Sequence, residues 1–251
     1  MTLLLLVLFG VGATTILDRI NTTSWDKTLW VGVFPMNADG SSVAESYVRS
    51  LKVEDFAGLE TFFASEAARY GVKVGRPVRI ELYPSPKDLP PALAPRANIL
   101  QTIWWSLKMR WYARTAASVP GRAPSHIRVF VLYHDPALNP RVPHSLGLQK
   151  GLVGVVHAFA DKRMAGANNI VIAHETFHTV GATDKYDLAN GAPLYPEGFA
   201  EPERSPRFPQ RYAEIMAGQR AVSDTEHEMP ANLRSVRVGE QTAAEIGWTA
   251  R

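Results

Sequence analysis

The sequence predicts a mixed α/β domain, in which helices pack on a twisted sheet and the C-terminal part is rich in loops. Three observations lead to this fold class. Segments with strand periodicity alternate with segments of helical periodicity up to Gly181. The 251 residues, 46% of them hydrophobic and 20% charged, suffice for one soluble domain with a full core. Five prolines between Asp187 and Gln210 predict irregular structure after the last long helix.

The charge balance and the lack of cysteine limit the classes of partner and site. A formal net charge of +3 is too small to predict a nucleic-acid partner. The chain has no cysteine, which excludes disulfides and thiolate metal ligands. Any metal must therefore be held by nitrogen and oxygen ligands. We expect a monomer that binds no nucleic acid.

The chain begins with an apolar segment that carries no charged side chain before Asp18. Its length is that of a signal-peptide core, shorter than the roughly 20 residues that span a bilayer. Residues Val11–Ala13 offer a small-residue cleavage site, although no lysine or arginine precedes the apolar run. We interpret residues 1–20 as a signal peptide or a membrane anchor, with residues 3–17 as the tether, and residues 21–251 as one catalytic domain. Either interpretation predicts export, to the periplasm or the medium; a buried first strand or helix is the alternative.

The first strand-like and helix-like segments follow in order. Residues Thr28–Met36 are rich in β-formers and end at the turn cluster Asn37–Gly40. From Val53 to Tyr70 the apolar residues recur with helical period, and Gly71 ends the helix. Val78–Tyr83 alternates with a period of two, as a half-buried strand does. A proline-rich connection comes next.

A long helix is expected from the N-cap Asn98 to about Ala117. It is apolar on more than one side, and three basic residues lie among its apolar residues. We expect a central helix packed on a sheet; an aromatic and basic patch for a nucleic acid or a membrane is the alternative. The expected core face is Leu100, Ile103, Trp104, Leu107 and Trp111; the second stripe is Trp105, Met109 and Tyr112, and the basic residues are Lys108, Arg110 and Arg114.

Two further strands lead to the last long helix. They are His126–His134 and Gly151–Ala160, and the second comes directly before the helix. Near the C-terminus, Ser235–Val238 predicts a short strand and Thr242–Ile246 a last helical turn or two. Trp248 is expected to pack this end of the chain against the core.

The last long helix carries a metal-binding motif. His174 and His178 lie four residues apart, so a helix places both imidazoles on one face with Glu175 beside them. Two histidines and a carboxylate in this spacing are typical of zinc hydrolases. Gly181 marks the helix end, and Asp184 can return an oxygen to the metal as third protein ligand. Histidines that merely face the core or solvent are the alternative.

The pattern from His174 to Asp184 resembles the metzincin signature in its variant with aspartate as third ligand. That variant is similar to snapalysin-like and immune-inhibitor-A-like secreted bacterial metallopeptidases. Metzincins also have a methionine in a tight turn below the metal, and Met216 within Glu214–Gly218 is the candidate. The resemblance covers residues 150–220. It implies a metzincin-like mixed sheet with the active-site helix under the edge strand.

The resemblance also implies a function. Zn²⁺ would be the cofactor, Glu175 the general base on a metal-activated water, and a peptide or protein the substrate of endopeptidase cleavage. The strand Gly151–Ala160 stands where metzincins have the sheet edge, to which extended substrate adds as a further strand. The backbone groups expected to bind substrate are those of Gly154, Val155, Val156 and His157. Two alternatives are an inactive metal-containing binding or assembly module on the same fold, and a hydrolase of non-peptide amides or esters.

Several roles stay open in the sequence. Tyr186 and Tyr212 are candidates to stabilise the oxyanion of the reaction, and each is equally suited to packing. His157 is a fourth metal ligand, an oxyanion donor or a structural residue. Asp187 is an alternative metal ligand, a calcium ligand or a turn-former with Asn190–Gly191, and turn chemistry favours the last.

Overall fold

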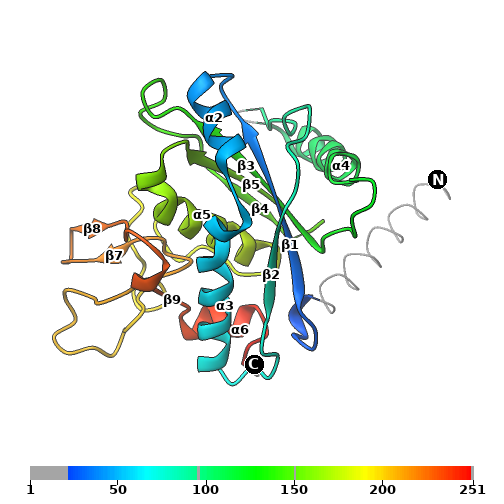
Figure 1. The fold of residues 1–251 in the computed structure, drawn as a ribbon. Coiled ribbons are helices and arrows are strands. Elements are labelled where there is room, and N and C mark those ends of the chain that lie inside the picture. The colour runs from blue at the N-terminus through cyan, green and yellow to red at the C-terminus, as the bar shows by residue number, and fades with distance from the viewer. Residues whose placement is uncertain (1–21, 95–96, 150, 250–251) are drawn as a thin grey trace.

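The computed structural model describes residues 22–94, 97–149 and 151–249. The expected leader at residues 1–20 lies outside the described residues. Within them the chain forms a mixed α/β fold, a five-stranded mixed sheet with five α-helices (Figure 1). None of these helices combines the length and the apolar character that crossing a lipid bilayer requires.

The sheet has the strand order β2-β1-β3-β5-β4. Its first four strands in this order are parallel to one another, and β4 runs antiparallel to β5. The strands are β1 (Leu29–Asn37), β2 (Val78–Leu82), β3 (Ile127–His134), β4 (Leu146–Leu148) and β5 (Val153–Phe159).

Helices cover both faces of the sheet, and each face forms its own hydrophobic core with the helices that cover it. The larger core joins one sheet face to α2, α3 and α5; the smaller joins the other face to α4 (Figure 1). Alternate residues of β3 enter the two cores, with Val131 in the larger and Phe130 in the smaller. This explains the unbroken apolar run from Val129 to Tyr133 in β3. The helices are α2 (Ser42–Ser50), α3 (Ala57–Arg69), α4 (Ile99–Ala116), α5 (Ala165–Thr179) and α6 (Glu240–Glu245).

Short elements connect these helices and build the C-terminal part. The 3-10 helix η1 (Val53–Phe56) leads into α3, and η2 (Lys162–Met164) leads into α5. Beyond α5 the chain is mostly loop, as expected. The remaining elements are β6 (Ala213–Glu214), β7 (Arg220–Ala221), β8 (His227–Glu228), η3 (Leu233–Ser235) and β9 (Val236–Arg237).

Most expected elements are confirmed within a residue or two, including the N-cap at Asn98, whose side chain accepts from the Gln101 amide. Among the α-helices and the strands of the five-stranded sheet, two were not expected. Helix α2 has only nine residues, and Ala44 is its single buried one. Strand β4 has only three residues, too few to show alternation, and it owes its position to contacts with β5 and α5.

The expectation that the strand before the metal helix forms the sheet edge is wrong. Residues 153–155 of β5 pair with β3 on one side and with β4 on the other. Further along, the His157 amide donates to the Ser145 hydroxyl at 3.0 Å. The backbone of Gly154 and Val155 is therefore inside the sheet, and the edge strand is β4.

The expected core face of α4 is also wrong, because the second apolar stripe is the buried one. Trp105 and Met109 are 8% and 0% exposed, whereas Trp111 is 72% exposed. The polar atoms explain the choice of side. The Trp105 indole N–H donates to the Pro91 carbonyl at 2.7 Å, and the Tyr112 hydroxyl to the Asp88 carbonyl at 2.6 Å. Only this side of the helix gives both rings a partner in the preceding loop.

The C-terminal end packs against the core as expected. Trp248 is 5% exposed and its ring contacts the rings of Trp25, Tyr70 and Phe177. The Trp25 indole N–H donates to the Ile246 carbonyl at 2.7 Å. These contacts fix α6 beneath α5, near the end of the metal-binding motif.

The two stripes of α4 give a direct test of this arrangement. Met109→Ala should cost about 2–5 kcal/mol of unfolding free energy, because it leaves a cavity in the smaller core. Trp111→Ala, two residues away, should change it by no more than about 0.5 kcal/mol. Urea unfolding followed by circular dichroism measures both. A larger loss of stability for Trp111→Ala than for Met109→Ala would mean that the Trp111 stripe is the buried one, contrary to the structure.

Candidate metal centre

Helix α5 carries the two histidines, and its neighbours fix its position. At its start the Asn168 side chain bonds to both the amide and the carbonyl of Phe159, at 3.1 and 2.9 Å, which joins the helix to the end of β5. At its other end Phe177 is fully buried and stacks on Phe63 of α3 at 4.7 Å between ring centroids. The remaining face of the last two turns presents His174 and His178, whose ring centroids are 4.7 Å apart.

The helix ends at Gly181, and the turn there returns the chain toward the histidines. The Ala182 amide donates to the Phe177 carbonyl and the Gly181 amide to the His178 carbonyl, both at 3.1 Å, which is the Schellman pattern. Gly181 has a φ of 110°, a conformation that side chains disfavour. The return brings one oxygen of Asp184 to 3.1 Å from His174 Nε2 and 3.0 Å from His178 Nε2.

Backbone carbonyls set the tautomers of both histidines. His174 Nδ1 contacts the Ile215 carbonyl and His178 Nδ1 contacts the Ala182 carbonyl, each at 2.9 Å. Since a carbonyl oxygen only accepts, each Nδ1 carries the hydrogen and each Nε2 presents a lone pair. The two Nε2 atoms lie 3.1 Å apart, beside the Asp184 oxygen.

Three lone pairs this close to one another repel unless a cation lies among them. That cation can be a metal ion or a proton on one of the rings. The group His174, His178 and Asp184 can hold a metal ion, with each residue offering one ligand atom. Two imidazoles and one carboxylate fit a zinc ion that keeps a fourth position open, and the carbonyls behind the rings are the partners such ligands use. The donor set therefore fits the metal that the motif implies.

The pKa directions agree with a cation site. Burial raises the pKa of Asp184, but hydrogen bonds from the two imidazoles lower it well below its usual range, so the ligand is a carboxylate. Burial lowers the pKa of His174, yet the bond to Asp184 and the charge of Glu175 raise it above its usual value. A proton and a metal ion therefore compete for the same lone pairs.

Glu175 lies beside the group and is almost completely buried, at 5% exposure. Its Oε2 atom has no hydrogen-bond partner among the described residues. Burial, together with the charge of Asp184, raises its pKa, and the two histidines only partly oppose this. A buried carboxyl oxygen without a partner, with a raised pKa, is suited to receive a proton.

The edge strand β4 covers this part of α5 at Gly147. A Cβ at that position would lie 2.4 Å from His178 Cβ, 2.5 Å from the Glu175 carbonyl oxygen and 3.1 Å from Glu175 Oε2. Only glycine allows β4 to lie this close to the helix. The edge of the sheet is thereby brought next to the carboxylate of Glu175.

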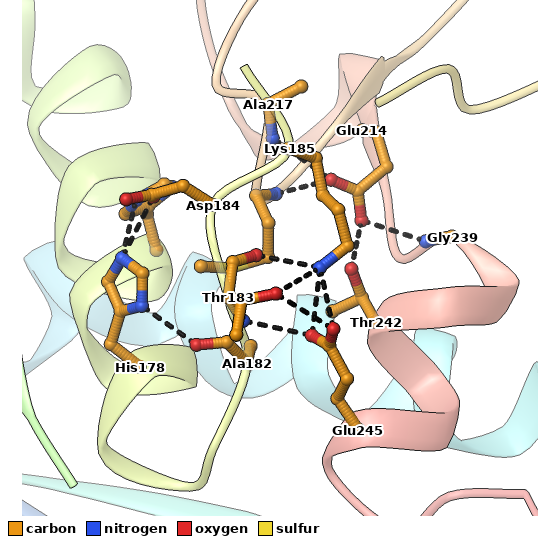
Figure 2. Close-up of polar contacts among 12 residues, drawn as sticks. His178, Ala182, Thr183, Asp184, Lys185, Glu214, Ala217, Gly239, Thr242 and Glu245 are labelled. Atoms are coloured by element: carbon orange, nitrogen blue, oxygen red, sulfur yellow. Dashed lines mark hydrogen bonds and ion pairs between the residues drawn. The ribbon is translucent and has the colours of Figure 1, made fainter. Parts of the chain in front are cut away.

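An ion pair fixes the two neighbours of Asp184 (Figure 2). Lys185 is 5% exposed, and its ammonium contacts both Glu245 oxygens at 2.8 and 2.9 Å. Glu245 also accepts from the amide and the hydroxyl of Thr183, at 2.9 and 2.8 Å. Helix α6 thus holds the residues on both sides of Asp184, which leaves that side chain little choice of direction.

Met216 lies in a tight turn that contacts both the histidine helix and the segment that carries Asp184. The turn closes with bonds from the Ala217 and Gly218 amides to the Glu214 carbonyl, and Met216 is fully buried. The Ile215 carbonyl accepts from His174, and the Met216 carbonyl accepts from the Lys185 amide at 3.0 Å. The position agrees with a methionine turn below the metal, and its effect on the metal stays a prediction.

The turn depends on the buried carboxylate of Glu214. One oxygen accepts from the Met216 and Ala217 amides, and the other from the Gly239 amide and the Thr242 hydroxyl (Figure 2). Burial raises the pKa of Glu214. These four bonds connect the turn to the start of α6, the helix that also carries Glu245.

The remaining candidate residues differ in their relation to the group. The Tyr186 ring lies 6.3 Å from the His174 ring, and burial and the charge of Asp184 raise its pKa. Tyr212 lies under the Arg237 guanidinium at 4.0 Å. Asp187 accepts from the Ala189 amide in a turn closed by Gly191, as expected of a turn-former.

His157 is paired with another histidine. Its Nδ1 is 2.9 Å from His134 Nε2, and burial and the His134 charge lower its pKa to about 4. The ligand group contains His174, His178 and Asp184, and His157 lies outside it. A fourth metal ligand at His157 is therefore not supported.

The chain matches no protein-family model, and no curated protein matches it. Sequence reasoning missed Gly147, Lys185, Glu214 and Glu245. Their roles arise from contacts between distant parts of the chain, such as the separation of 60 residues between Lys185 and Glu245, for which the sequence has no local pattern.

The ion pair behind Asp184 can be tested with Glu245→Gln. The variant leaves the Lys185 ammonium buried without a counter-charge, which should cost about 3 kcal/mol of unfolding free energy. It should also lower zinc affinity about 10–100-fold, because Asp184 loses its support. Urea unfolding and chelator competition measure the two effects. The control is Glu240→Gln on the exposed side of the same helix, which should change neither.

The pH dependence of the same variant gives an independent check. Burial raises the pKa of Glu245, but hydrogen bonds from Lys185 and Thr183 bring it below its usual value of 4.5. The pair therefore stabilises the fold fully above that pH and is lost as pH falls below it. The stability difference between wild type and Glu245→Gln should shrink in acid. A difference that stays constant would show that the ion pair is not its cause.

Gly147→Ala tests the contact between β4 and α5. The added methyl group meets backbone, so β4 must move away from Glu175, at a cost of about 1–3 kcal/mol. Gly58→Ala is the matched control, because Gly58 lies in α3 with open space around it, and alanine there should stabilise by up to about 1 kcal/mol. If Gly147→Ala were as stable as the wild type in urea, β4 would not lie in close contact with α5 at this position.

Proposed function

We propose that this protein is a zinc-dependent endopeptidase of metzincin-like type. The observation that carries the proposal is the convergence of His174, His178 and Asp184 beside Glu175, whose Oε2 atom has no hydrogen-bond partner within the described part of the chain. A purely structural zinc site uses four protein ligands and needs no base. Three ligands with an adjacent carboxylate are the arrangement of zinc hydrolases.

The proposed chemistry assigns distinct tasks to the metal and the chain. Zinc, when bound, supplies Lewis acidity that polarises the substrate carbonyl and acidifies water. Glu175 takes the proton of the attacking water at its carboxylate and delivers it to the leaving amine. Burial raises the pKa of Glu175 toward pH 7. The carboxylate therefore holds the proton more readily after the first transfer and can deliver it to the amine.

Tyr186 is the preferred candidate to stabilise the oxyanion. Its ring lies near His174, and its hydroxyl, whose pKa burial raises further above the ordinary value, is protonated at neutral pH and able to donate. Tyr212, packed under Arg237, is the weaker candidate.

The position of β4 supports a peptide substrate. It is the last strand in the sheet order, pairs only with β5 within the described residues, and passes beside Glu175 at Gly147. An extended peptide can add to such an edge by backbone hydrogen bonds. We therefore place the proposed substrate on β4 rather than on Gly154 to His157.

Glu175→Gln is the decisive variant for this proposal. It keeps the size of the side chain and removes the proton acceptor, so cleavage of a denatured protein should fall about 10²–10⁴-fold. The bound zinc should stay at one ion per chain, because the three ligands are intact. Glu54→Gln, an exposed carboxylate on η1, should leave the rate unchanged. Metal analysis and a fluorescent-casein assay measure both quantities.

Three other outcomes would contradict parts of the proposal, and the first two identify the alternative functions. Zinc bound without cleavage by wild type or variant contradicts the enzyme and favours a binding or assembly module. Cleavage of small amides or esters without cleavage of peptides favours a non-peptide hydrolase. Loss of zinc together with activity in Glu175→Gln would mean that Glu175 is a ligand rather than a base.

A further inference from the structure

Helix α4 presents a broad apolar face to solvent. We name this surface the α4 face, and it consists of Ile99 (80% exposed), Leu100 (77%), Ile103 (54%), Trp104 (61%), Leu107 (45%) and Trp111 (72%). At 3.6 residues per turn these positions span an arc of about 140°. Large apolar residues gathered in this way mark an interaction surface, because water disfavours contiguous apolar area.

The charge around the α4 face is positive. Residues 99–116 contain Lys108, Arg110 and Arg114 and no aspartate or glutamate. On the helix wheel Arg110 and Arg114 fall within the apolar arc, and Lys108 lies at its border. An amphipathic helix with tryptophan and aliphatic residues on one face, accompanied by basic side chains, suits the surface of an anionic membrane.

A basic pocket adjoins the C-terminal end of this face. The pocket is open, has a volume of about 1120 Å³, and is lined by Lys27, Arg110, Arg114 and Arg128 against one acidic residue, Asp26. Arg110 also has a buried Nε without a hydrogen-bond partner among the described residues. Apolar surface beside a pocket of this charge matches a phospholipid, whose phosphate lies next to its acyl chains.

The path of the chain leads to the same side of the molecule. Thr22, the first described residue, and Ser24 line the basic pocket together with Arg110 and Arg114. The sequence that precedes them is apolar from Leu3 to Leu17. Any contact of that segment with a bilayer would bring the α4 face toward the lipid.

We propose that the α4 face docks this protein on membranes rich in anionic phospholipid. Trp104 and Trp111 lie at the level of the headgroups, Leu100 and Leu107 reach the acyl boundary, and Arg114 contacts phosphate. Because α4 and α5 cover opposite faces of the sheet (Figure 1), docking leaves the metal centre directed away from the lipid. This inference does not depend on the proposed peptidase activity.

Other occupants fit the surface less well. A second copy docked face to face would bring the cations of two α4 helices together, without an acidic residue on either helix to pair them. A nucleic acid would use stacking on aromatic rings, whereas four of the six residues of the α4 face are aliphatic. These occupants are outcomes of the following test.

The test uses the full chain and vesicles whose phosphatidylcholine is brominated in the acyl chains, with or without phosphatidylglycerol. Bromine quenches only tryptophans at the lipid, and residues 1–24 contain none. The wild type should be quenched on anionic vesicles and far less on neutral ones. Trp104→Phe/Trp111→Phe should still sediment with the vesicles but lose most of the quenching, since Trp25, Trp105 and Trp248 are buried. The sixth tryptophan, Trp30, is half-buried under the Arg79 guanidinium, and Trp30→Phe should leave the quenching of the wild type nearly unchanged.

Two further variants separate the apolar and charged contributions. Leu100→Gln/Leu107→Gln should lower the partition coefficient on anionic vesicles at least tenfold. Lys108→Gln/Arg114→Gln should lower it about thirtyfold, with little change on neutral vesicles. The control Leu138→Gln/Met229→Gln alters exposed apolar residues outside the α4 face and should bind as the wild type does.

Three results would overturn the proposal. Sedimentation with vesicles without quenching would mean that the leader alone binds lipid. Equal binding by Leu100→Gln/Leu107→Gln and the wild type would show that the α4 face takes no part. Absence of vesicle binding, with a dimer in analytical ultracentrifugation that these two substitutions dissociate, would assign the face to a second copy.

Discussion

The position of Asp184 beside the two histidines depends on the buried ion pair between Lys185 and Glu245. The motif helix by itself supplies two imidazoles, and its bonds to Ala182 do not set the path of the residues that follow. The pair decides this, because it holds Lys185 while Glu245 also binds Thr183. Asp184, between these two residues, then meets both histidines. A buried ammonium is costly without its partner, so this local geometry is strongly enforced.

The C-terminal part has few regular elements, but it acts as a support for the site. Glu214 joins the turn at Met216 to the start of α6, and α6 in turn provides Glu245. The same turn offers the Ile215 carbonyl to His174. The loop-rich region therefore fixes one histidine tautomer and the direction of the aspartate at once. This links the packing of Trp248 and Trp25, which anchors α6, to the chemistry of the site.

Much of the fold and the grouping of His174, His178 and Asp184 could be predicted from the sequence, because both depend on local periodicity and spacing. Spacing predicts the helix stop at Gly181 and an Asp184 within reach of the histidines, but it does not predict the Lys185–Glu245 pair that fixes this return. What could not be predicted depends on contacts across the chain. Helix α4 has two apolar stripes, and helical periodicity does not determine which one is buried. The buried stripe is the one on which Trp105 and Tyr112 reach backbone carbonyls of the preceding loop. Strand β4 is too short to show alternation, so β5 was wrongly expected at the edge.

The most direct measurement of the central claim is X-ray absorption at the zinc edge of the purified protein. We predict one zinc per chain, with two imidazole nitrogens at about 2.0–2.1 Å and the remaining ligands oxygen at about 2.0–2.2 Å. Substitution of Asp184 by alanine should remove one oxygen and leave both imidazole contributions. A first shell with fewer than two imidazoles, or a protein that binds no stoichiometric zinc, would contradict the account.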